Sequence, residues 1–119
     1  MDIKQGDIFW VDLDEPLGSE PGYRRPHVVI QNNLYNNSSL DTIIVCALTT
    51  NLKRRRSPEN VLLKKGEANL PKQSMVIVSQ IFTVDRRDLV EKIGSLPRQR
   101  IRQILKGIHM LTTPSVRNW

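Results

Sequence analysis

The strongest constraint on the fold of this chain is a series of short apolar runs, separated by polar turns and followed by one amphipathic segment. The runs are short and rich in β-branched residues, which favours strands over helices. The predicted strands are Gly6–Leu13, His27–Ile30, Thr42–Leu48, Val61–Leu63 and Ser74–Val78. Near the end, apolar residues recur at helical spacing from Ile101 to Leu111, and Pro97 suits a first helical turn.

This order of elements predicts a mainly β fold, in which at least five strands form a small, partly open β-barrel closed by a C-terminal helix. The chain has 119 residues, enough for one hydrophobic core, so we expect a single domain over residues 1–119. The polar stretch from Asn32 to Ser39 is predicted to connect two strands, and Thr49–Pro58 to form a basic loop.

The sequence also limits the surroundings in which the protein works. No run approaches the roughly 20 apolar residues of a membrane span, and the N-terminus lacks the apolar core of a signal peptide. The single cysteine, Cys46, excludes an internal disulfide bond and lies in an apolar run, where we expect an inert core residue. We therefore predict a cytoplasmic protein with no membrane partner.

The charge of the chain points to an acidic partner. Lysine and arginine number 18 against 12 acidic residues, a formal net charge of +6. Such a surplus is typical of proteins that bind nucleic acid, an acidic membrane surface or an acidic protein segment, although a merely basic soluble protein also fits. Aromatic residues make up only 5% of the chain, too few for a broad base-stacking platform.

The segment from Gly18 to Pro26 combines a constrained turn with two charged groups. Pro21 and Gly22 suit the second and third positions of a type II turn, which would bring Glu20 and Arg25 face to face. A carboxylate and a guanidinium held in this way can serve phosphoryl chemistry. From the residues alone, an ordinary surface salt bridge is the favoured interpretation.

Several blocks, in this order and at this spacing, resemble the MazF/PemK ribonuclease toxins. The N-terminal blocks are Gly6-Asp7-Ile8, Asp12-Leu13, Gly18-Ser19-Glu20, Arg25-Pro26 and Val28-Val29-Ile30-Gln31-Asn32. The later blocks are Thr49-Thr50, Gln80-Ile81-Phe82-Thr83-Val84-Asp85 and Ile93-Gly94-Ser95-Leu96. The resemblance covers nearly the whole chain, and the number of matched blocks makes it specific.

This resemblance implies an SH3-like barrel that pairs into a homodimer, and the activity of a toxin that cleaves single-stranded messenger RNA. Cleavage is expected to need no metal or other cofactor: the ribose 2′-hydroxyl attacks the adjacent phosphate, leaving 2′,3′-cyclic phosphate and 5′-hydroxyl ends. The expected protein partner is an antitoxin with an acidic, initially disordered segment. It would bind in the basic groove and lose conformational entropy as it does so.

Carried over residue by residue, the resemblance points to Arg25 and Thr49 as the core of the catalytic site. The planar fork of Arg25 can hold two phosphate oxygens, and Thr49 can donate a hydrogen bond to the same phosphate. Glu20 matches the family's acidic position and would act as the base or orient Arg25. The group that protonates the leaving oxygen is not assigned.

Further residues are candidates for RNA binding. Lys53, Arg54 and Arg55 belong to a basic run only a few residues after Thr49, where they would contact the RNA backbone. Arg86 is compatible with an RNA groove and with ordinary surface alike. Candidates for hydrogen bonds to unstacked bases are Ser19, Asn32 and Gln80.

The remaining titratable residues and two other function classes complete the predictions. Neither histidine, His27 or His109, forms a metal-ligand cluster with Cys46. His27 lies next to the loop and could assist there, but strand packing or exposure is the expected role, and His109 is expected to be structural. A toxin of the CcdB kind, which shares the barrel but poisons a topoisomerase, is one alternative function. A non-catalytic SH3-like RNA-binding module is the other, and an assay of RNA cleavage separates both from a ribonuclease.

Overall fold

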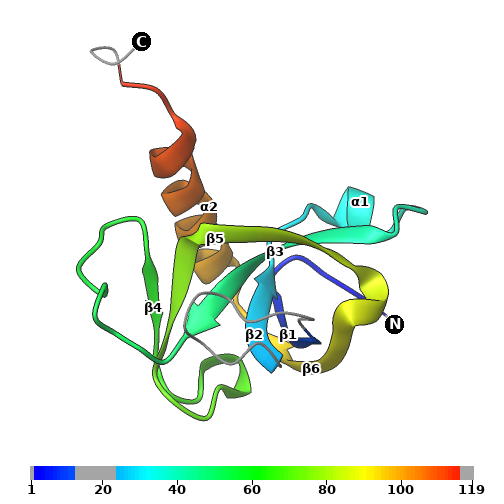
Figure 1. Cartoon of the computed structure of the whole chain (residues 1–119), viewed down its shortest axis with the longest axis horizontal. Coiled ribbons are helices and arrows are strands. Elements are labelled where there is room, and N and C mark those ends of the chain that lie inside the picture. The colour runs from blue at the N-terminus through cyan, green and yellow to red at the C-terminus, as the bar shows by residue number, and fades with distance from the viewer. Residues whose placement is uncertain (1, 13–23, 116–119) are drawn as a thin grey trace.

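The computed structural model describes residues 2–12 and 24–115, which form one antiparallel sheet, two helices and two 3-10 turns. The strands are β1 (Asp7–Asp12), β2 (Arg24–Val29), β3 (Thr42–Thr49), β4 (Val61–Leu63), β5 (Ser74–Asp85) and β6 (Leu89–Ser95). The helices are α1 (Asn33–Asn36) and α2 (Arg98–Thr112), and the 3-10 turns are η1 (Glu67–Asn69) and η2 (Arg86–Asp88). Figure 1 shows their arrangement.

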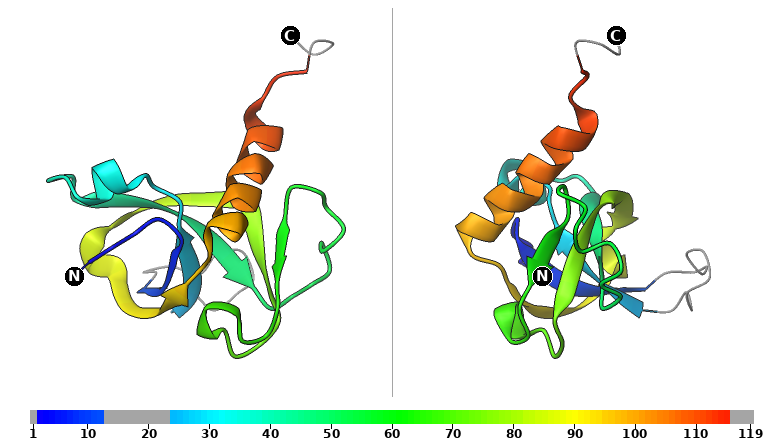
Figure 2. Two further views of the ribbon diagram at one scale, coloured as in Figure 1. Left: turned by 180° about the vertical axis from the view of Figure 1, so that it is seen from behind. Right: turned by 90° about the vertical axis from the view of Figure 1, so that its left-hand side faces the viewer.

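The six strands lie in the order β4-β5-β3-β2-β1-β6, so β4 and β6 are the two ends of the sheet. The sheet curls on itself instead of lying flat (Figure 2), and η1 partly bridges the gap between its ends. Asn69 of η1 donates from Nδ2 to the carbonyl of Ile93 in β6, 3.1 Å away. Gly94 is required beside it, because a Cβ there would collide with the Ala68 backbone. The result is the partly open, mainly β barrel that the sequence predicted.

The core has two layers, one on each face of the sheet, because successive residues of a strand point to opposite faces. On one face, Cys46 and Val78 pack with Ile104 of α2, all fully or almost fully buried. On the other face, Phe9 and Val45 form a second buried cluster. Burying each large side chain of this kind contributes roughly 1.5–3 kcal/mol of transfer free energy.

Helix α2 begins after Pro97, as predicted, and packs against β5 and β4. Gly107 faces the loop before β4, where the backbone carbonyl of Glu59 lies so close that a Cβ would not fit. Glycine lowers the helix propensity at this position, but it allows the loop to pack closely against α2. No helix within residues 2–12 and 24–115 has the length and apolar character needed to cross a membrane.

Four elements differ from the sequence prediction. Strand β2 begins at Arg24 instead of His27, so Arg25 lies in a strand and not in the predicted loop. Strand β5 continues to Asp85, and β6 was not predicted at all, since its exposed charged residues Glu91 and Lys92 obscure the apolar pattern. Charged residues are common on edge strands, where they discourage pairing with other chains. The polar connection after β2 contains the single turn of α1, capped by the side chain of Asn32, which accepts from the Leu34 amide at 2.8 Å.

Candidate functional site

Arg25 lies in β2 and is buried, with 7% of its surface exposed. Its Nη2 donates to the backbone carbonyl of Leu48 in β3 at 3.2 Å. Strands β2 and β3 are antiparallel, with His27 opposite Ala47. Arg25 lies two residues before His27 and Thr49 lies two residues after Ala47, so both reach the same end of the sheet. The antiparallel register therefore brings together two predicted catalytic residues that are far apart in the sequence.

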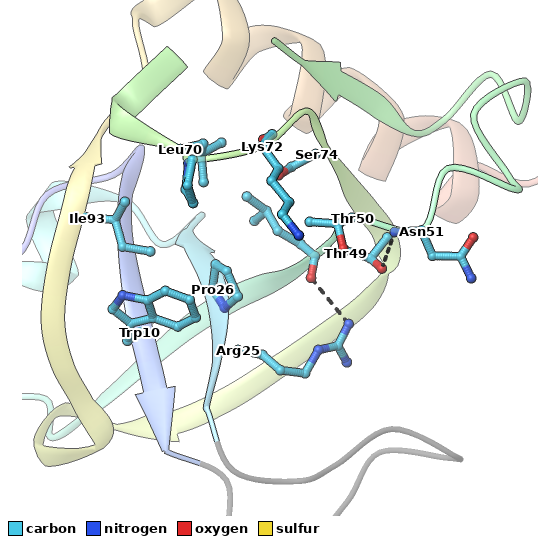
Figure 3. A pocket seen from close by; sticks show the side chains of 12 residues that line it. Trp10, Arg25, Pro26, Thr49, Thr50, Asn51, Leu70, Lys72, Ser74 and Ile93 are labelled. Carbon is cyan, nitrogen blue, oxygen red and sulfur yellow. Dashed lines mark hydrogen bonds between the residues drawn. The ribbon is translucent and has the colours of Figure 1, made fainter. Parts of the chain in front are cut away.

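Both residues line a cavity of about 450 Å³ at this end of the barrel. Figure 3 shows an apolar side formed by Trp10, Pro26 and Ile93 and a polar side that carries Thr49 and Asn51. The remaining lining residues are Arg25, Leu48, Thr50, Leu70, Pro71, Lys72 and Ser74. A concave site with apolar walls and a few placed polar groups is the usual form of a ligand-binding cavity.

A second cavity of about 370 Å³ adjoins the first, since Thr49 and Asn51 line both. Its other lining residues are Lys53, Arg54, Met75, Ile77, Ser79 and Gln80. We call these two adjoining cavities together the Thr49 groove. The predicted RNA-binding residues Lys53, Arg54 and Gln80 all line it.

The Thr49 groove is positively charged. Arg25 and Lys72 line its first part, Lys53 and Arg54 line its second part, and no carboxylate is among the described lining residues. Cations gathered along a concave surface concentrate the potential and favour a polyanion over a neutral ligand. The groove can therefore hold a phosphodiester backbone.

Thr49 is half-buried, and its Oγ1 accepts a hydrogen bond from the Asn51 amide at 3.1 Å. This bond fixes the side chain and uses only an acceptor position, so the hydroxyl hydrogen can still be donated. Together, Arg25 and Thr49 can contribute charged and neutral donors to one anion. Asn51, Lys72 and Trp10 also line the groove. Sequence reasoning missed Trp10 and Lys72 because they are far from Thr49 in the chain, and Asn51 because its polar surroundings mark it only as part of the basic loop.

The other predicted site residues have different positions. Glu20 and Ser19 lie outside the described residues. Asn32 caps α1, and Arg86 donates to the backbone carbonyls of the α1 turn and the loop after it, at 2.6 Å to Asn36 and 2.7 Å to Leu40. Neither Asn32 nor Arg86 lines the groove, and their RNA contacts stay predictions.

Arg55 lines a separate cavity beside α2, although it follows Arg54 directly in the chain. Gln80 is half-buried, and its Oε1 is a buried atom without a hydrogen-bond partner in the described part of the chain. The basic run is therefore divided between two cavities. The sequence analysis predicted that Lys53, Arg54 and Arg55 act together as one RNA-binding surface.

His27 is fully buried on the strand that carries Arg25. Its Nδ1 donates to the carbonyl of Arg25 at 3.0 Å, and its ring meets Phe82 edge to face at 5.9 Å between centroids. The pKa of His27 is lowered to about 4, mainly by burial and to a smaller extent by the positive charge of Arg25, while this hydrogen bond acts in the opposite direction. A neutral imidazole at physiological pH supports the backbone of Arg25 and fits the structural role predicted for it.

The two other residues predicted to be structural, Cys46 and His109, differ in burial. Cys46 is fully buried, and burial raises the pKa of its thiol to about 12, so the side chain is an inert core residue. His109 lies exposed on α2. No group of three or more histidine, cysteine, aspartate or glutamate side chains within the described ranges is placed to hold a metal ion.

Comparison with known proteins identifies the family of this chain. Residues 4–112 match the family described as PemK-like, MazF-like toxin of type II toxin-antitoxin system. The chain is 37% identical over 108 residues to endoribonuclease MazF6 of Mycobacterium tuberculosis, covering 91% of this chain and 95% of that protein. It is 34% identical over 106 residues to endoribonuclease MazF of Staphylococcus saprophyticus, covering 89% of this chain and 88% of that protein.

Solved structures share the fold. MazF in a MazE–MazF crystal structure from Deinococcus radiodurans superimposes with a TM-score of 0.76 at 21% identity, covering 97% of this chain and 99% of that one. The Mycobacterium tuberculosis toxin MazF-mt6 gives a TM-score of 0.71 at 19% identity, over 87% and 93% of the two chains. The predicted resemblance is confirmed, and the chain belongs to the PemK-like, MazF-like toxin family of type II toxin-antitoxin systems.

Proposed function

We propose that this chain is the toxin of a type II toxin-antitoxin pair and an endoribonuclease that cleaves single-stranded messenger RNA in the Thr49 groove. One observation carries the proposal: Arg25 and Thr49 line the same cavity, in a groove whose charged residues are all cationic among those described. The family and the relatives named endoribonuclease support the same activity.

Cleavage proceeds by attack of the ribose 2′-hydroxyl on the adjacent phosphorus. The bond from the 2′-oxygen to phosphorus forms as the bond to the 5′-oxygen breaks, leaving a 2′,3′-cyclic phosphate and a 5′-hydroxyl end. The 2′-hydroxyl loses a proton and the leaving oxygen gains one, so the reaction consumes no water. Negative charge builds on the non-bridging oxygens, where preorganised donors lower the barrier most.

Arg25 supplies the charge for this step. Its guanidinium is held by the Leu48 carbonyl, so the side chain needs little reorganisation when the phosphate arrives. The fork geometry of a guanidinium lets it contact two phosphate oxygens at once. Thr49 donates its hydroxyl hydrogen to the same phosphate, and Glu20 accepts the 2′-hydroxyl proton or orients Arg25.

In this scheme the guanidinium neutralises the charge that a metal ion would neutralise in other nucleases. We therefore propose that cleavage needs neither a metal nor another cofactor, and that it takes place in the cytoplasm, where messenger RNA is translated. The basic groove would also bind the acidic segment of the antitoxin. Occupation of the groove by that segment would exclude RNA.

The active form is a homodimer. Ile44 and Ile81 are 38% and 40% exposed. Ile81 is paired with Cys46, and Ile44 lies two residues before Cys46 on the same strand. Both side chains therefore lie on the face of Cys46, which is the sheet face against which α2 packs. Leu105 is 40% exposed on α2, whose C-terminal end projects beyond the sheet (Figure 2). A second copy that covers these apolar side chains would remove them from water and close the assembly by symmetry.

The test is cleavage of a defined single-stranded RNA by the purified chain. We expect 5′-hydroxyl and 2′,3′-cyclic phosphate ends, activity that persists in excess EDTA, and no cleavage at a nucleotide whose 2′-hydroxyl is replaced by 2′-methoxy. RNA binding without cleavage would indicate the non-catalytic module, and loss of activity on chelation would refute the metal-independent scheme. Light scattering at micromolar concentration tests the dimer.

A further inference from the structure

A third cavity, of about 490 Å³, lies between α2, β4 and the basic loop, outside the Thr49 groove. Arg55 and Asn60 line it from the loop, Val61 from β4, and Gln103, Lys106 and Met110 from α2. We call it the α2 cavity. Nothing in the proposed cleavage step uses it, yet it carries positive charge and an apolar floor.

The basic loop separates this cavity from the Thr49 groove. Arg54 lines the groove and Arg55 lines the α2 cavity, although the two residues are adjacent in the chain. Hydrogen bonds hold this arrangement: the Arg55 amide donates to Leu52 at 3.1 Å and the Ser57 amide donates to Arg54 at 3.1 Å. A strand leaving the groove therefore needs to cross only this loop to reach the second cavity.

The cations of the α2 cavity differ in their availability. Arg100 donates to both carboxylate oxygens of Glu67, at 2.6 and 2.9 Å, and its charge is largely compensated. Arg55 and Lys106 are exposed, and neither forms an ion pair with another described residue. No described carboxylate lines the cavity. Arg55 from the basic loop and Lys106 from α2 are thus two cations, without ion pairs to described residues, that line the same cavity.

The cavity and the proposed dimer contact lie on different sides of α2. Successive helical residues are about 100° apart, so Gln103 and Leu105 lie on opposite flanks of the buried Ile104. Gln103 lines the cavity, whereas Leu105 belongs to the exposed apolar flank. A partner that covers Leu105 would leave the Gln103 flank open to a ligand.

We propose that the α2 cavity binds the RNA strand beyond the cleaved bond, with Arg55 and Lys106 each contacting a backbone phosphate. This proposal rests on the proposed function and extends the substrate site from the scissile phosphate across the basic loop. A nucleic acid carries a charge on every unit, which matches cations placed on both sides of one narrow loop. The apolar floor offers a surface for an unstacked base.

The experiment compares two RNAs that contain the same cleavage sequence, a short one ending close to it and a long one extended at both ends. Both carry 2′-methoxy at the cleaved position, so binding is measured without cleavage and with Arg25 intact. The variant is Arg55→Gln/Lys106→Gln. The control, Arg98→Gln/Lys65→Gln, removes the same charge from exposed residues that line none of the described cavities.

For the long RNA, we expect the variant to bind more weakly and the slope of log affinity against log salt to fall by about 0.7 for each phosphate that the variant no longer neutralises. The short RNA should bind the variant and the control alike. The single-turnover rate on cleavable short RNA at saturation should fall far less than it does with Arg25→Ala, because the cavity does not touch the scissile phosphate.

An equal loss of affinity for both RNAs, or no loss for either, overturns the extended site. A variant that keeps its affinity for long RNA but loses affinity for a decaglutamate peptide assigns the cavity to an acidic protein segment instead. The proposed function is judged separately, by whether the wild type cleaves RNA at all. If it cleaves and the variant still binds long RNA as tightly as the control, only the further inference fails.

Discussion

The guanidinium of Arg25 donates to the backbone carbonyl of Leu48, the residue directly before Thr49, at 3.2 Å. The same bond ties β2 to the end of β3 and sets the position of the charged group relative to the threonine hydroxyl. The Arg25 side chain therefore contributes both to the stability of the fold and to the proposed cleavage step. Substitutions at this site have to be assessed by both unfolding and cleavage.

Arg25→Ala should lower the single-turnover cleavage rate at saturating RNA by about 10²–10³-fold, the usual effect of removing one preorganised donor to a developing oxyanion. The buried hydrogen bond to Leu48 is also removed, so the free energy of unfolding should fall by about 1–2 kcal/mol without unfolding the protein at assay temperature. Arg87→Ala, an exposed arginine of η2, is the control for both measurements. A folded Arg25 variant that cleaves normally would remove Arg25 from the mechanism.

Thr49→Val should lower the cleavage rate by about 10–100-fold, since one hydrogen bond to a charged group is worth roughly 1.5–3 kcal/mol. Valine keeps the shape of threonine, so the far-ultraviolet circular dichroism spectrum should not change. Thr49→Ser should recover most of the rate, because it restores the hydroxyl. Thr42→Val, at the other end of β3, tests whether any threonine of this strand has the same effect.

Stability should depend on His27 below neutral pH. The folded state holds the pKa of His27 at about 4, below the ordinary value of 6.5, so unfolding takes up a proton when the pH is below 6.5. The free energy of unfolding should thus be fully retained above pH 6.5 and decline as the pH falls towards 4. The expected total loss is about 3 kcal/mol, from a shift of this size.

Urea unfolding between pH 7 and pH 4 measures this effect. His27→Leu removes the titrating group, so the decline over this range should become shallower than in the wild type, even if the variant is less stable at pH 7. His109→Gln, which changes an exposed histidine, should keep the wild-type slope. Identical slopes for the His27 variant and the wild type would contradict the assignment.

Glu67 and Arg100 join η1 to α2 through paired hydrogen bonds. The hydrogen bond from Arg100 is the main reason that the pKa of Glu67 lies below its ordinary value of 4.5. Glu67→Gln should lower the free energy of unfolding by about 1–2 kcal/mol near neutral pH, as expected for a charge-assisted pair that is mostly shielded from water. Below pH 4.5 the difference from the wild type should shrink as Glu67 becomes protonated.

A double-mutant cycle with Arg100→Gln measures the coupling between the two side chains. We expect the double variant to lose less stability than the sum of the two single variants, since the second change removes an interaction that is already broken. Glu91→Gln, on the exposed part of β6, is the matched control and should change stability by less than about 0.5 kcal/mol. Additive losses would show that the pair contributes nothing as a unit.

Local sequence information was enough for most of the fold. Strand β4 matches its predicted bounds, Val61–Leu63, and β1, β3 and the helix after Pro97 agree with prediction to within a residue or two at most ends. These elements follow from side-chain period and turn residues, which act between near neighbours in the chain. Strand β6 escaped prediction because its exposed face carries charge, and it is stabilised by pairing with β1.

The sequence by itself determined the mainly β architecture through its apolar pattern, and its resemblance to the MazF/PemK toxins supplied the family and the expectation that Arg25 and Thr49 act together. Only the tertiary structure decided that these two residues share a cavity, that His27 is buried and neutral on the strand of Arg25, and that Arg54 and Arg55 line different cavities. The physical reason is that register, curl and burial depend on contacts between residues distant in sequence. A local sequence pattern does not specify which distant backbone or side-chain groups will lie beside it in the folded protein.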